Sequence, residues 1–164
     1  MDTSELPFPF SLLFQHTWLL FIIVTCINAF SLKFQSKKYV EQNPSLEDDY
    51  EKIFRGYLFY LNIPWVIMGI GMIFGDFKSI FDFLFGIRSG NPFILLFFGS
   101  VIALWVIAVV WIYFQGGAEF LIEHPSILRT MTKSPIEIKI YVALMLLGGI
   151  FGLAGMWTVG SFLP

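Results

Sequence analysis

The sequence predicts an all-α integral membrane protein: a bundle of four transmembrane helices, with a short amphipathic helix lying in the membrane interface between spans two and three. Its composition is 57% hydrophobic and 13% charged, whereas about a quarter of the residues in soluble domains are charged. The charges are also segregated, and they leave four uncharged stretches of 27, 20, 30 and 25 residues. Because about 20 apolar residues in a helix cross a bilayer, each stretch is long enough to span once.

The four stretches are predicted as helices because they do not alternate between polar and apolar residues, as the strands of a membrane barrel do. Three helix starts are marked by a capping residue followed by proline at the first helical position: Asn-Pro at 43–44 and 91–92, and Ser-Pro at 134–135. The second helix should therefore begin outside the membrane. The predicted spans cover approximately residues 10–32, 56–75, 92–115 and 139–161 of a single membrane domain, residues 1–164.

The distribution of basic residues predicts the orientation of the chain. Five basic residues lie between spans one and two and three lie between spans three and four or at the start of span four, whereas the loop at 76–91 holds only Lys78 and Arg88. Cytoplasmic loops of membrane proteins carry an excess of Lys and Arg. The loops at 33–55 and 116–138 are therefore expected in the cytoplasm, and the two termini and the loop at 76–91 outside.

The outer loop has the pattern of a short helix lying in the membrane interface. On a helical projection its apolar face is made by Phe77, Ile80, Phe81, Leu84 and Phe85, and its polar face by Lys78, Ser79 and Asp82. Phe83 does not fit this pattern, because it falls on the polar face. A re-entrant half-helix is the alternative, and it would have to be buried in protein or line a water cavity.

Glycines mark two helix faces that can pack closely against another helix. Gly148, Gly152 and Gly155 follow one another at i, i+4 and i+7 in span four, and Gly71 and Gly75 form a second pair in span two. Helices in lipid associate through such small residues, since no hydrophobic force draws them together. The faces predict either packing inside the bundle or an interface between subunits.

Polar residues inside the spans form a second group of candidates. Pro64 cannot donate to the carbonyl of Tyr60, so span two should kink there. Asn62 lies beside this kink, and Asn28 and Gln115 are expected near the same depth, toward the cytoplasmic side. These three residues are interpreted either as an interhelical hydrogen-bonded clamp or as the polar lining of a path for an ion or solute.

Glu119, Glu123 and His124 are weak candidates for a metal site. The two carboxylates are i, i+4 and the imidazole follows directly, a set of ligands suited to a divalent metal. The alternative is that these charges are solvated and face nearby basic residues. His16 is expected on the opposite side of the membrane from His124, so the two histidines should not bind one haem. Cys26 is the only cysteine, so the sequence predicts no zinc cluster and no intrachain disulfide.

The sequence contains no catalytic motif, and three functions stay open. The leading one is a non-enzymatic membrane subunit that packs through its glycine-lined helix faces into a homo-oligomer or a larger membrane complex. The first alternative is an oligomeric channel or passive transporter, and the second is a membrane enzyme with a Glu/His site on the cytoplasmic side. The expected partners are the lipid bilayer and other membrane chains, identical or different; neither nucleic acid nor a cofactor is expected.

Overall fold

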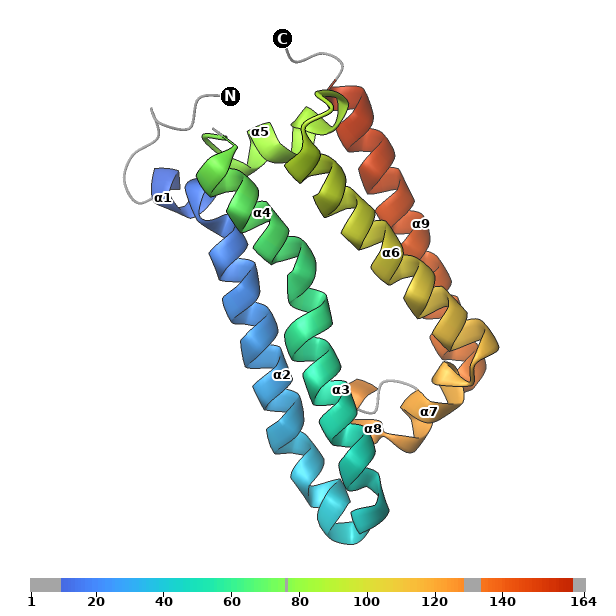
Figure 1. The fold of residues 1–164 in the computed structure, drawn as a ribbon. Helices are drawn as coiled ribbons and strands as arrows, with labels where there is room; N and C mark the ends of the chain where they lie inside the picture. The colour runs from blue at the N-terminus through green and yellow to red at the C-terminus, as the bar shows by residue number, and fades with distance from the viewer. Residues whose placement is uncertain (1–9, 76, 129–133, 161–164) are drawn as a thin grey trace. The chain divides into compact units, whose positions relative to one another are not determined.

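A computed structural model describes residues 10–75, 77–128 and 134–160. All regular secondary structure in these ranges is helical (Figure 1). Four helices there are long and apolar enough to cross a membrane: α2 (Thr17–Gln42), the continuous helical run Pro44–Phe74, α6 (Pro92–Phe114) and α9 (Pro135–Val159). The protein is therefore a multi-pass helical membrane protein.

The remaining elements are shorter. The run Pro44–Phe74 consists of η2 (Pro44–Leu46), α3 (Glu47–Phe59), η3 (Tyr60–Asn62) and α4 (Ile63–Phe74), and the other short helices are α1 (Phe10–Gln15), α5 (Ile80–Phe85), η4 (Gly86–Arg88), α7 (Gly117–Glu123) and α8 (Pro125–Leu128).

The predicted helix starts are confirmed. The Oδ1 atom of Asn91 accepts a hydrogen bond of 3.0 Å from the backbone N–H of Phe93, so it caps α6. Asn43 caps η2 in the same way, through the N–H of Ser45, and α9 begins at Pro135. These starts are marked by residues close in sequence, the capping asparagines and the prolines at the first helical position, which is why the sequence predicts them.

The first apolar helix differs from its predicted span at both ends. The chain bends at His16, between α1 and α2, and α2 then continues to Gln42, well beyond the uncharged stretch. Contacts with α3 hold this extension: Lys33 forms an ion pair of 3.0 Å with Glu51, and its ammonium lies 4.5 Å from the centre of the Phe54 ring. The first charged residue after the apolar stretch thus packs against a neighbouring helix, and α2 continues beyond it.

The contacts of the chain fall into two compact units, and parts of all four long helices contribute to each. The first unit combines the described parts of 1–24, 62–102 and 149–164, and the second combines 25–61 with 103–148. The core of the first unit is built from buried side chains of α4, α5 and α6, with Trp18 of α2 and Leu153 of α9 packed against it: Met68, Ile80, Phe83, Ile94, Phe97 and Phe98.

The loop between α4 and α6 contains the short helix α5, and Phe83 packs this helix into the core of the first unit. Ser79 caps the helix by accepting a hydrogen bond of 3.3 Å from the N–H of Asp82. Phe83, the residue that did not fit the predicted amphipathic pattern, has an exposed fraction of 0%. Its ring packs edge-on against those of Phe77 and Phe97. A helix is thus present in this loop, while its position in the membrane interface stays a prediction.

The second unit is held by the pair α2 and α3 and by a small cluster around Ile112, Ala118 and Ile138. The hydroxyl of Tyr113 donates a hydrogen bond to the carbonyl of Lys139, which joins α6 to α9. Between α6 and α7 the chain turns at Gly116, whose φ of 73° is in the left-handed region that favours glycine.

Candidate functional sites

The glycines of α9 lie on an open face. A Cβ atom added to Gly148, Gly152 or Gly155 would meet no atom of the described chain within 4 Å. Large apolar residues on the same side of the helix are also exposed, among them Met145 and Phe151. No close helix contact thus uses this face among the residues that the structure describes.

The glycines of α4 have the opposite surroundings. Gly71 is buried, and a Cβ there would lie 2.6 Å from the ring of Phe83 and 2.9 Å from the Cβ of Phe93. Gly69, which was not among the glycines predicted from spacing, packs against the ring of Trp18. A Cβ added at Gly69 would lie 2.6 Å from this ring. Gly75 follows the last residue of α4, and a Cβ there would meet the backbone carbonyl of Gly71 and the ring of Phe77. In this helix, glycine is needed for contacts within the first unit.

The polar candidates of span two lie at a local irregularity. The 3₁₀ turn η3 (Tyr60–Asn62) interrupts the α-helical run directly before Pro64, which is buried at the start of α4. Asn62 is buried too, and it belongs to the first unit. Asn28 and Gln115 belong to the second unit, where both are exposed.

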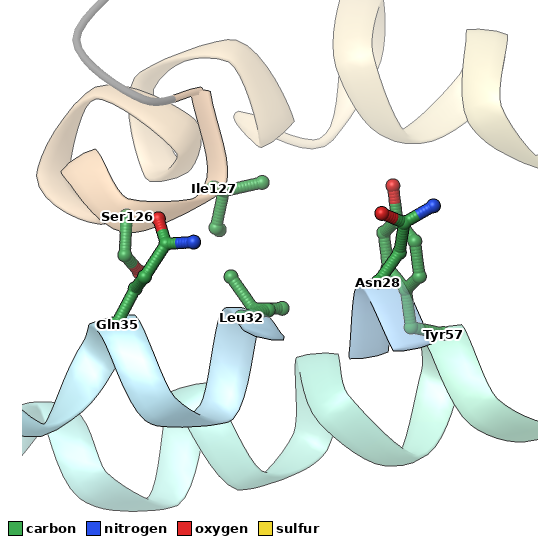
Figure 2. Close-up of a pocket in the computed structure, with 6 residues that line it drawn as sticks. All are labelled: Asn28, Leu32, Gln35, Tyr57, Ser126 and Ile127. Carbon is green, nitrogen blue, oxygen red and sulfur yellow. The ribbon is translucent and has the colours of Figure 1, made fainter. Parts of the chain in front are cut away.

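Asn28 lines a pocket of the second unit that has a volume of about 280 Å³ (Figure 2). Its walls come from α2, α3 and α8, and they consist of Asn28, Leu32, Gln35, Tyr57, Ser126 and Ile127. Gln115 does not line this pocket. Figure 2 shows the polar groups of Asn28 and Tyr57 at one end, those of Gln35 and Ser126 at the other, and two aliphatic side chains between them.

The acidic candidates of α7 have separate surroundings. Both glutamates are exposed, and Glu119 forms an ion pair of 3.4 Å with Lys139. The pKa of the Glu119 carboxyl is held below its ordinary value by a hydrogen bond from its own backbone N–H, and further by the ammonium of Lys139. Within the described ranges, no group of three or more His, Cys, Asp and Glu residues could hold a metal ion.

His124, by contrast, is buried, with an exposed fraction of 1%. Its Nδ1 atom lies 2.7 Å from the carbonyl oxygen of Phe120, and because a carbonyl can only accept, Nδ1 carries the proton. The imidazole stacks on the ring of Phe120 at 4.0 Å and meets the ring of Tyr50 edge-on. Its Nε2 atom lies 3.6 Å from the Oδ2 atom of Asp49 and has no hydrogen-bond partner among the residues that the structure describes.

Sequence reasoning did not identify most of the pocket residues. Asn28, Leu32 and Gln35 follow one another at i, i+4 and i+7 on α2, so their common face was visible in the sequence. Tyr57 and Ser126 gave no such signal, because they reach the pocket from α3 and α8 through tertiary packing. The comparison of this chain with protein-family models, curated proteins and solved structures gave no match.

Proposed function

We propose that the protein is a non-enzymatic membrane subunit that self-associates through the glycine face of α9. The observation that carries this proposal is the open face itself. In the most apolar 18-residue stretch of α9, 0% of the residues are buried by the rest of the chain. Three glycines with no neighbour within 4 Å lie on this helix.

An open glycine face favours contact with another helix for a physical reason. Lipid tails are as apolar as the side chains of α9, so burial alone gives no driving force for association in a bilayer. Two backbones that approach closely gain dispersion energy and weak Cα–H···O contacts. Glycine permits that approach, and it loses little by giving up contact with lipid.

A second copy of this chain is the partner that fits best. Copies inserted in the same orientation present α9 in parallel, and small residues spaced four apart, as at Gly148 and Gly152, mediate parallel helix pairs. In a dimer with two-fold symmetry, the glycine face of one copy packs against the same face of the other copy. No charged residue occurs between residues 140 and 160, so the pairing brings no like charges together.

Gly152→Leu tests the proposal. The native mass of the protein released from lipid nanodiscs should be that of an oligomer for the wild type and that of a monomer for the variant, because the leucine side chain holds the two helices apart. Gly99→Leu is the matched control, since Gly99 is also exposed in a long helix with no neighbour within 4 Å. A monomeric wild type, or equal loss of the oligomer in both variants, would contradict self-association through this face.

The orientation of the subunit is part of the same proposal: both termini outside and the loops at 33–55 and 116–138 in the cytoplasm. It is tested by placing single cysteines in a Cys26→Ser background. Ser89→Cys should react in intact cells with a maleimide that cannot cross membranes, and Lys37→Cys should react only after the membrane is permeabilised. Both positions are exposed. The reverse pattern of labelling would show the inverted orientation.

The other two functions predicted from the sequence have less structural support than the open glycine face gives to self-association. For a polar path through Asn28, Asn62 and Gln115, the supporting observation is limited to the second unit, where Asn28 lines a pocket and Gln115 does not line the same pocket. An enzyme site at Glu119, Glu123 and His124 is not supported by a shared contact, since Glu119 pairs with Lys139 and His124 faces Asp49. Both stay predictions.

A further inference from the structure

The pocket between α2, α3 and α8 has the lining of a binding site for a small polar molecule. We propose that it binds an uncharged, hydroxyl-rich group of the size of a single sugar unit. The pocket volume of about 280 Å³ lies just below the range of drug-sized small-molecule sites, which runs from about 300 to 1,000 Å³, so it suits a small ligand. This site is separate from the glycine face of α9.

A buried hydroxyl group in the wall of the pocket indicates that a polar ligand belongs there. Ser126 has an exposed fraction of 5%, and its Oγ atom has no hydrogen-bond partner among the residues that the structure describes. A buried polar atom without a partner raises the free energy of the folded protein. A rotation of the Ser126 side chain about its Cα–Cβ bond would turn the hydroxyl toward the pocket, where a ligand hydroxyl can supply the missing hydrogen bond.

The chemistry of the lining selects an uncharged ligand. None of the six lining residues carries a charge at neutral pH, so an ion of either sign would be held without a countercharge. Two amides and two hydroxyls supply both donors and acceptors. The Nε2 atom of Gln35 already donates a hydrogen bond of 2.8 Å to Ser31. Its second N–H and its carbonyl oxygen make no hydrogen bond to the residues that the structure describes, so both can bind a ligand. Hydroxyl groups suit such a lining because each of them both donates and accepts.

The shape of the lining selects a ligand with an apolar face. Asn28 and Gln35 are seven residues apart on α2, a rise of about 10 Å along the helix. Between the two polar ends lie the aliphatic side chains of Leu32 and Ile127 (Figure 2). A sugar ring has hydroxyls around its rim and C–H groups on its face, so it can match both parts at once.

Two sources supply this chemistry, a free sugar and the sugar headgroup of a glycolipid. The first probe is methyl β-galactoside, added to the full-length protein in phosphatidylcholine nanodiscs and followed by saturation-transfer NMR. The second is galactosyl diacylglycerol mixed into the same nanodiscs, whose retention on the protein is measured by native mass spectrometry. Saturable binding of either probe supports the site, and the probe that binds identifies the source.

Two variants test whether the binding takes place in this pocket. Asn28→Ala and Ser126→Ala should each weaken binding by about fivefold, the effect of one lost hydrogen bond between uncharged groups. Asn28 is exposed, so its replacement leaves the fold intact even if Ser126→Ala destabilises it. Gln42→Leu is the matched control, because Gln42 carries an exposed amide on the same helix outside the pocket. No saturable binding of either probe, or binding unchanged in Asn28→Ala, would overturn the proposal.

Discussion

Gly71→Ala is expected to destabilise the protein by about 1–3 kcal/mol, the cost of forcing a methyl group into a packed core. The added Cβ would lie 2.6 Å from the ring of Phe83 and 2.9 Å from the Cβ of Phe93. The ring of Phe83 is itself wedged between neighbouring rings, and a Cβ position is set by the backbone, so neither can move away without shifting α5 or α6. Equilibrium unfolding in mixed micelles, with an increasing fraction of denaturing detergent, measures the loss.

Gly99→Ala is the control for this experiment. Gly99 also lies inside a long helix, but nothing would approach an added Cβ within 4 Å. Because alanine favours helix by about 1 kcal/mol over glycine, this variant should be neutral or slightly more stable. If both variants shift the unfolding midpoint equally, the close approach at Gly71 does not hold α4, α5 and α6 together.

The contrast between the glycines shows what the sequence could and could not predict. Spacing marked Gly71 and Gly148 alike as packing positions, yet Gly71 is buried and Gly148 is open. Spacing along a helix identifies a face, whereas the neighbour of that face comes from another part of the chain. For Gly71 the neighbour is Phe83, a residue that falls on the polar face in the predicted amphipathic pattern of its own helix.

The same distinction holds for the whole fold. Helix length and helix start depend on residues close in sequence, so composition and capping signals predicted the four long helices and the starts at Pro92 and Pro135. The pocket could not be predicted, because it joins α2 to Tyr57 and Ser126 across long separations in sequence. His124 was grouped with Glu119 by proximity along the chain, but the chain leaves the helix after α7, and the imidazole turns to the buried side.

His124→Ala is expected to cost about 2–4 kcal/mol of stability, because it removes a buried ring and a buried hydrogen bond together. The ring fills the space between Phe120 and Tyr50, and its Nδ1–H donates to the carbonyl of Phe120. Alanine would leave a cavity there. His124→Phe should be less costly than His124→Ala, since phenylalanine keeps an aromatic ring in the stack and loses only the polar interactions.

The second histidine supplies a control with the same local hydrogen bond. The Nδ1 atom of His16 lies 3.1 Å from the carbonyl oxygen of Leu12, four residues earlier, but this histidine is exposed. His16→Ala should therefore change stability by no more than about 0.5 kcal/mol. The same unfolding measurement distinguishes the effect of burial from that of the local hydrogen bond. If His124→Ala lowers stability and His16→Ala does not, burial of the His124 ring accounts for the effect. If the two alanine variants lose equal stability, the local hydrogen bond accounts for the effect, and the packing of His124 between α3 and α7 does not stabilise the second unit.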